Sequence, residues 1–129
     1  MKRITRTFKA LSDETRLRIL HLLIEAGEIC VCDMETVLGC PQARISRHLS
    51  VLKNAGLIED RREGLWILYS LTRPGDSNHR SIVRALKEVV DSAEEFAADK
   101  KKLRQAVQQG RCKTFQIIMP DSLPRAFSH

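Results

Sequence analysis

Rows of apolar residues, spaced three or four positions apart, predict that most of this chain is helical. They mark helices over residues 5–11, 14–26 and 42–55 and a short helical segment over residues 33–38. The short segment and the helix over residues 42–55 are joined by Gly39-Cys40-Pro41, a glycine-containing turn. Two helices joined by such a short turn fit a helix-turn-helix.

A β-hairpin is predicted directly after the helix-turn-helix. Between residues 57 and 71 the apolar positions are β-branched, aromatic or aliphatic, and they surround a polar tip, Arg61-Arg62-Glu63-Gly64. A hairpin in this position is a wing. Basic residues at its tip can reach the adjacent minor groove or the phosphate backbone of DNA.

Helical spacing returns from about residue 78 to residue 108. One helix over this stretch would be about 45 Å long, more than a small domain can cover, so we expect a dimerisation helix. After Gly110, prolines at 120 and 124 exclude a helix. The expected fold is α+β and mainly α: a winged helix-turn-helix with a two-stranded β-wing and a long C-terminal dimerisation helix, in one domain over residues 1–109 followed by a mobile tail over residues 110–129.

The charge of the chain favours a polyanionic partner. There are 22 Lys and Arg residues against 16 Asp and Glu residues, a formal net charge of +6, and the pI is about 9.5. No apolar run approaches the roughly 18 residues of a membrane span, and the start MKRITRTF lacks the apolar core of a signal peptide. We therefore expect a cytoplasmic protein with no membrane association.

The sequence offers little for catalysis. Cys30 with His21 or His48 is the only pairing that could supply a nucleophile and its base. A glycine-rich phosphate loop and a pair of carboxylates in one block are both absent from the sequence. We therefore expect a binding protein and not an enzyme.

The helix over residues 42–55 carries an apolar face and a basic face, as a DNA-reading helix requires. The first turns of such a helix meet base edges, whereas cations further along it and on the wing meet phosphates. The expected base-reading residues are Gln42, Arg44, Ser46, Arg47 and His48, and the expected phosphate contacts are Lys53, Arg61 and Arg62.

Four blocks of the sequence, in order and at matching spacing, resemble the signature blocks of one family. They are LSDETRLRIL (11–20), EICVCDM (28–34), ISRHLSVLKNAGLI (45–58) and RREGLWILYSL (61–71). On these blocks the chain is similar to the ArsR/SmtB family of prokaryotic winged-helix repressors, and to its arsenite-sensing branch. The resemblance implies a homodimer that binds double-stranded operator DNA and releases it on binding a metal or metalloid.

The resemblance places Cys30 and Cys32 in the sensing site, at the start of the third helix. Side chains two residues apart on a regular helix point about 200° apart, so the pair can share an ion only at a frayed helix start. Thiolates select soft or borderline ions, and we expect As(III) or Sb(III) as the inducer, with Cd(II), Pb(II) or Zn(II) as the alternatives. A thiol redox switch that joins one of the two to another cysteine is a further alternative.

Two thiolates are too few for such a site, and the third ligand is open. The arsenite sensors of the family continue as CVCDxC, but this chain has Glu35 at the last position. Cys40 lies in the turn, about 12 Å of helix beyond Cys32, where an apolar residue is usual. We favour Cys112, because it follows the predicted end of the last helix and a crossed dimer could bring it to the partner's pair.

The second metal site known in the family is not expected. That site uses an acidic residue and a histidine at the start of the last helix, together with a later histidine. This chain offers Asp76 and His79, but no further histidine follows before His129.

Overall fold

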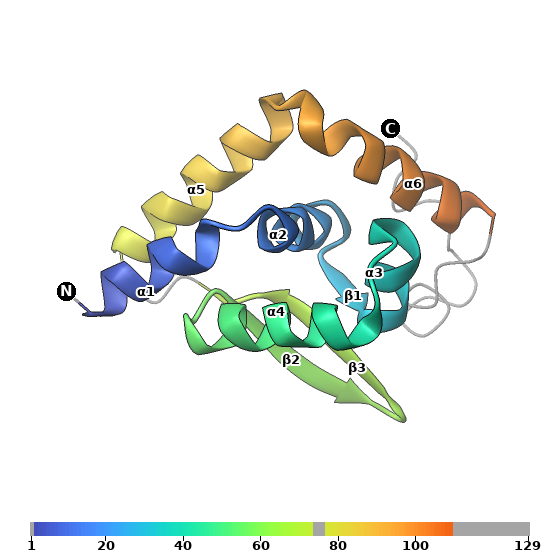
Figure 1. Cartoon of the computed structure of the whole chain (residues 1–129), viewed down its shortest axis with the longest axis horizontal. Coiled ribbons are helices and arrows are strands. Elements are labelled where there is room, and N and C mark those ends of the chain that lie inside the picture. The colour runs from blue at the N-terminus through green and yellow to red at the C-terminus, as the bar shows by residue number, and fades with distance from the viewer. Residues whose placement is uncertain (1, 74–76, 110–129) are drawn as a thin grey trace.

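Six α-helices and a three-stranded sheet form the part of the chain that the computed structural model describes, residues 2–73 and 77–109. The winged helix-turn-helix expected from the sequence is confirmed, with α3 and α4 as its two helices and β2 and β3 as its wing (Figure 1). In chain order the elements are α1 (Lys2–Leu11), α2 (Glu14–Ala26), β1 (Glu28–Cys30), α3 (Val31–Leu38), α4 (Gln42–Asn54), β2 (Ile58–Glu63), β3 (Trp66–Leu71), α5 (Ser77–Ser92), the 3₁₀ turn η1 (Glu94–Phe96) and α6 (Ala97–Gln108).

Helix α2 lies at the centre of the fold, and local signals fix both of its ends (Figure 1). The carboxylate of Asp13 accepts a hydrogen bond of 3.0 Å from the backbone N–H of Arg16, and this bond lowers the pKa of Asp13. Gly27 ends the helix with φ +83°. Between these ends four side chains are buried in the core: Ile19, Leu20, Leu22 and Leu23.

The two predicted strands of the wing are joined by a third strand, β1, which the sequence did not predict. The sheet has the order β1-β3-β2 and is antiparallel throughout. β1 pairs with β3 so that Glu28 lies opposite Ser70 and Cys30 opposite Leu68. The sheet therefore fixes the backbone that leads directly into α3.

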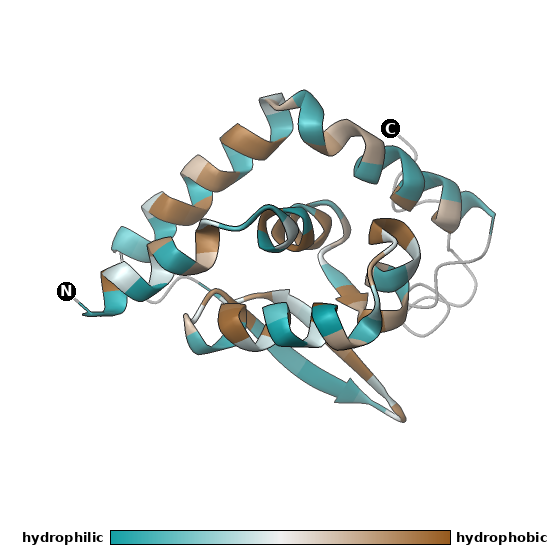
Figure 2. Ribbon diagram, viewed as in Figure 1, coloured by the Kyte–Doolittle hydropathy of each residue, from teal (hydrophilic) through white to brown (hydrophobic). Residues whose placement is uncertain are grey.

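The tip of the hairpin also differs from the prediction. Glu63 pairs with Trp66, so the turn consists of Gly64 and Leu65, and Gly64 has φ +62°. Arg61 and Arg62 lie within β2 and not at the tip. Figure 2 shows that β2 is largely hydrophilic, as expected for a strand at the edge of the sheet.

The prediction of a single long C-terminal helix is wrong. α5 ends at Ser92, and η1 leads into α6, which runs in a different direction, so that the two helices form an arch over α2 (Figure 1). Beyond the break one row of apolar side chains is buried, since Phe96 is 7%, Leu103 0% and Val107 1% exposed. α6 packs against both α2 and α3 of its own chain.

Two expectations fall outside the described residues. The predicted tail over residues 110–129, with Cys112, is one, and Asp76 of the rejected second metal site is the other. Among residues 2–73 and 77–109, the helices are all too short or too polar to cross a membrane.

Candidate functional site

The cysteine pair lies where β1 gives way to α3, the first helix of the helix-turn-helix. Cys30 is the N-cap residue, with extended backbone angles of φ −88° and ψ 162°, and Cys32 is in the first turn of α3. The predicted position at a helix start is therefore confirmed. Cys30 is 1% exposed, whereas Cys32 is partly exposed.

A buried carboxylate accompanies the pair. The thiol of Cys30 donates a hydrogen bond of 3.3 Å to Oδ2 of Asp33, which is itself 3% exposed. A thiol must lose its proton to bind a metal, so a metal at Cys30 would have to replace this hydrogen bond. Among residues 2–73 and 77–109, no three His, Cys, Asp or Glu side chains converge into a group that could hold a metal ion. The pair alone is therefore too small a ligand set for a metal ion in this part of the chain, and the donor atoms it offers are soft sulfurs.

Cys40 lies at the opposite end of α3 from the pair. Gly39 ends that helix with φ +66°, and the Cys40 side chain is buried in the core cluster at 8% exposure. The guanidinium of Arg44 donates to its sulfur at 3.8 Å. The eight residues of α3 span about 12 Å between Cys40 and Cys30, so these contacts favour a packing role for Cys40.

Helix α4 presents the polar face expected of a recognition helix. Ile45, Leu49 and Leu52 are buried at 0%, 2% and 0% exposure and fasten it to the core. The opposite side is open to solvent along the first turns. The exposed side chains there are those of Gln42, Arg44, Ser46 and Arg47.

His48 has a different environment from the other predicted base-reading residues. Its side chain is 19% exposed and lies against the start of α2. Its Nδ1 is 3.2 Å from a guanidinium nitrogen of Arg16 and 3.8 Å from Oδ2 of Asp13. These contacts hold α4 against α2. Arg16 and Asp13 could not be predicted as part of the site, because a contact between separate helices has no local sequence signal.

Two of the three predicted phosphate contacts are engaged in ion pairs. The ammonium of Lys53 lies 3.0 Å from Asp60, and Arg61 donates to both carboxylate oxygens of Glu28, at 2.6 and 2.9 Å. These hydrogen bonds raise the pKa of Arg61 above its usual value. Arg62 is exposed, and in the described part of the chain it forms no ion pair. Arg61 is thus a clamp between β1 and β2, and Arg62 is the wing cation that is open to a phosphate.

Comparison with known proteins identifies the family. The sequence profile described as "Bacterial regulatory protein, arsR family" matches residues 13–60, which include the cysteine pair and the whole helix-turn-helix. The chain is 43% identical over 82 residues to an uncharacterised HTH-type transcriptional regulator from Methanocaldococcus jannaschii, a match over 64% of this chain and 89% of that protein. The chain belongs to the ArsR family.

A solved ArsR-like structure and a repressor support this assignment. The homodimeric winged helix-turn-helix DNA-binding domain of a possible ArsR-family regulator from Mycobacterium bovis is 32% identical, with a TM-score of 0.58 over 70% of this chain and 80% of that one. The arsenical resistance operon repressor of Escherichia coli K12 is 54% identical over 65 residues. That match covers 50% of this ArsR-family chain and 56% of the repressor, so the chain spans about half of the length of this relative.

Proposed function

We propose that this ArsR-family protein is a metalloid-responsive transcriptional repressor, which binds operator DNA as a homodimer and releases it when As(III) or Sb(III) binds its cysteine thiolates. The observation that carries this proposal is the position of Cys30 and Cys32. They flank the first residue of α3, at the start of the helix-turn-helix. A change of backbone at this point therefore acts on the DNA-reading unit itself.

The exposed side of α4 supports the DNA-binding part of the proposal. The guanidinium groups of Arg44 and Arg47 are exposed and can donate hydrogen bonds to guanine in the major groove. Gln42 and Ser46 lie beside them as further polar side chains. Arg62 on the wing supplies a phosphate contact, as Lys53 and Arg61 do if DNA displaces their carboxylate partners. His48, which is held by Arg16, acts by positioning α4.

Apolar side chains that remain exposed on α1 and α5 support the homodimer. Ile4 and Phe8 on α1 are 45% and 56% exposed, and Val89 on α5 is 59% exposed. A second copy that covers this surface would remove these side chains from water. Two copies place two recognition helices on one DNA face, where successive half-sites lie about 34 Å apart. The M. bovis relative is homodimeric.

The donor chemistry supports a soft inducer. Thiolates that share one ion must converge on it at about 2.3 Å, the length of a zinc–sulfur bond, whereas helical residues i and i+2 point apart. Cys30 is already extended at the N-cap, but Cys32 lies in the first helical turn, so we expect a shared ion to displace the start of α3. A shift from 99% DNA-bound to 1% needs about 5.5 kcal/mol of preference for the DNA-free state, which is within the binding energy of a multi-thiolate site.

Cys112 is the third ligand in this proposal. Cys112 itself lies outside the described residues, but α6 packs on α3 of its own chain and ends at Gln108, four residues earlier. Four residues span at most about 14 Å, so the same chain is a possible source of the ligand, as is the partner. Mixed dimers separate the two: a Cys112→Ser chain paired with a Cys30→Ser/Cys32→Ser chain keeps one complete site only if the ligand crosses the dimer.

The proposal is tested by fluorescence anisotropy on reduced protein under nitrogen. A double-stranded operator is first selected from random DNA, and arsenite is then titrated into its complex. We expect release of the DNA together with new thiolate-to-metalloid absorption. Cys30→Ser and Cys32→Ser should bind the operator as the wild type does and fail to release it, whereas Cys40→Ser, the matched control, should release it normally.

Each alternative gives a different outcome in the same experiment. If Cd(II), Pb(II) or Zn(II) released the DNA and arsenite did not, the inducer would be one of these ions and not a metalloid. Release by an oxidant alone, with no response to any of these ions, would make the cysteines a redox switch. Arsenite release that survives in the Cys30→Ser/Cys32→Ser protein would overturn the thiolate site.

A further inference from the structure

Helix α1 has three distinct rows of side chains. One row, with Thr7 and Ala10, is buried against the rest of the fold, and a second, with Ile4 and Phe8, is apolar and exposed. The third row is basic. It contains Lys2, Arg6 and Lys9, at spacings of four and three residues, and all three side chains are exposed.

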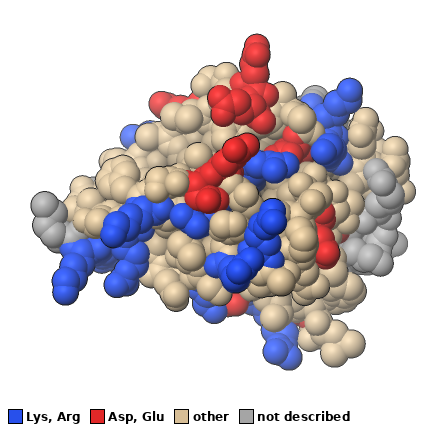
Figure 3. All heavy atoms as spheres, in the orientation of Figure 1, with Lys and Arg blue, Asp and Glu red and all other residues tan. Residues whose placement is uncertain are grey.

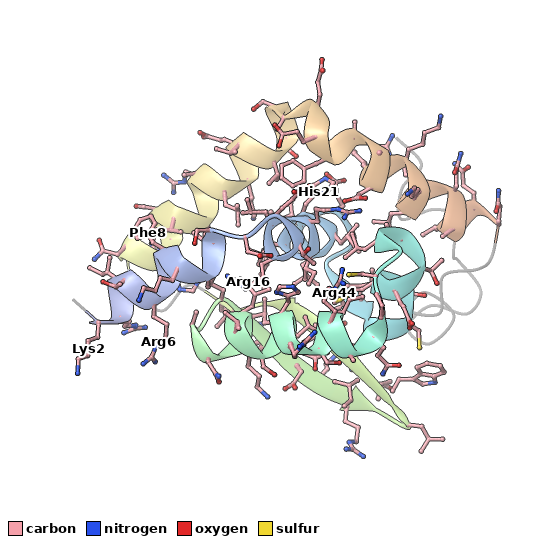
Figure 4. The ribbon with its side chains drawn as sticks, in the orientation of Figure 1. Lys2, Arg6, Phe8, Arg16, His21 and Arg44 are labelled. Atoms are coloured by element: carbon pink, nitrogen blue, oxygen red, sulfur yellow. The ribbon has the colours of Figure 1, made fainter. Side chains whose placement is uncertain are left out.

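The basic row faces the DNA-reading side of the molecule. Lys2, Arg6 and Lys9 line an open groove of about 570 Å³, together with Arg16 of α2 and Val51 of α4. Val51 is 40% exposed on the recognition helix. Figure 4 shows Lys2 and Arg6 extending from the lower side of α1, the level at which α4 lies. Four cations are thus placed beside the helix that reads DNA.

Hydrogen bonds fix α1 relative to α4. The Nε of Arg16 donates to the carbonyl of Ala10 at 2.7 Å, and a terminal nitrogen donates to the carbonyl of Lys9 at 3.2 Å. The other terminal nitrogen of Arg16 is 3.2 Å from Nδ1 of His48 on α4. One guanidinium therefore joins the end of α1 to the recognition helix. The basic row is held at a set position and does not depend on a flexible arm.

The charges of the whole molecule agree with this orientation. α1 contains Arg3 as well as the basic row and no acidic residue. Acidic side chains gather instead at the corner between α5 and α6, where Asp91, Glu94 and Glu95 are exposed. Figure 3 shows Lys and Arg over α1 and Asp and Glu at the top of the view, with further Lys and Arg at its upper right. The four cations of α1, with no acidic residue among them, favour a polyanion on this side of the molecule.

We propose that the basic row of α1 is a second phosphate-binding surface, which contacts the DNA backbone next to the groove that α4 reads. This inference rests on the proposed function and extends its DNA interface to a helix that carries no base-reading residue. The apolar row of Ile4 and Phe8 lies on another side of α1, so a partner chain that covers it leaves Lys2, Arg6 and Lys9 accessible. The sugar-phosphate backbone is the polyanion continuous with the surface of α4, and its contacts are independent of sequence.

The test compares two proteins that have lost the same charge. Arg6→Gln/Lys9→Gln removes two cations of the row, and Lys101→Gln/Lys102→Gln removes two exposed cations of α6. Affinity for the selected operator and for random duplex DNA is measured from about 0.05 to 0.2 M salt. Each lost phosphate contact reduces the slope of log K against log salt by about 0.9, and the homodimer loses two contacts in each protomer, so over this range the wild type should weaken roughly a hundredfold more than the α1 variant. The α6 variant should keep the wild-type slope.

Further measurements separate the outcomes. The α1 variant should lose affinity by the same factor on operator and random DNA and should remain dimeric in sedimentation, and Arg6→Lys should keep the wild-type slope. Equal slopes in the α1 variant and the wild type, or an equal fall in both double variants, would overturn the inference. Binding of wild-type protein to phosphatidylserine vesicles that is lost in the α1 variant, with an unchanged DNA slope, would assign the row to a lipid surface instead. Wild-type protein that binds no DNA at all would overturn the proposed function as well.

Discussion

The ion pair between Arg18 and Asp99 joins three helices, and its removal should destabilise the fold unequally from its two sides. Arg18 on α2 donates to both carboxylate oxygens of Asp99 on α6, at 2.8 and 2.9 Å, and also to the carbonyl of Leu38, the last residue of α3, at 3.4 Å. The Asp99 side chain is 4% exposed, but that of Arg18 is 28% exposed. Removal of Arg18 therefore leaves a buried carboxylate, whereas removal of Asp99 leaves a guanidinium that water can reach.

Arg18→Met leaves a carboxylate buried without its partner, which costs about 3–5 kcal/mol of unfolding free energy. Asp99→Asn leaves Arg18, which water can reach and which keeps its bond to Leu38, so the cost should be about 1.5–3 kcal/mol. Arg18→Met/Asp99→Leu leaves no orphaned charge and should recover most of the loss. The two single changes are therefore coupled, and the double variant should be more stable than Arg18→Met alone.

Urea unfolding followed by far-ultraviolet circular dichroism measures this difference. With a slope of about 2 kcal/mol per molar urea, a loss of about 4 kcal/mol lowers the midpoint by roughly 2 M. Protein concentration is kept constant across the variants, because dissociation of a dimer also moves the midpoint. Two results would contradict this expectation: Arg18→Met that costs no more than Asp99→Asn, or Arg18→Met/Asp99→Leu that is no more stable than Arg18→Met.

Three further predictions concern the wing, the dimer and pH. Arg62→Ala should flatten the salt dependence of DNA binding by about one unit of slope for each protomer, or roughly two for the homodimer, whereas Arg61→Ala should chiefly lower the urea midpoint. Phe8→Glu or Val89→Glu should shift sedimentation from dimer to monomer with little change in circular dichroism. Burial lowers the pKa of His21 below its usual 6.5, so its stabilising contribution is complete above that pH and declines below it, and His21→Leu should flatten the fall in stability between pH 7 and 5.

Elements with local signals could be predicted closely from the sequence. The helix over 14–26 has the same ends in the structure, because Asp13 and Gly27 supply its caps within one residue of its own ends. Ser12 precedes Asp13 and is another N-cap candidate by residue type, but its hydroxyl donates to the carbonyl of Lys9, at 2.9 Å. Both residues suit an N-cap chemically, and only the backbone geometry at the end of α1 decides between them.

Elements defined by distant partners could not be predicted. β1 has only three residues, too few for alternation to be visible, and it is a strand because Ile29 lies opposite Tyr69, forty residues later. The same holds for the candidate site. The residue types of Cys30, Arg61 and Lys53 suggest thiolate and phosphate chemistry. In the structure each of these side chains contacts a carboxylate, and that carboxylate belongs to another turn or strand. Sequence alone thus suggests a chemistry for these side chains but not the residues that contact them.

The break between α5 and α6 has the largest consequence for the proposed mechanism. The apolar spacing continues through Ala93 and Phe96 without proline or glycine, so nothing local ends the helix. Tertiary contacts end it: the Phe96 ring packs 5.2 Å from that of His21, and Asp99 pairs with Arg18. Because α3 packs against both α4 and α6, we expect a displacement at the cysteine pair to move the recognition helix and α6 together.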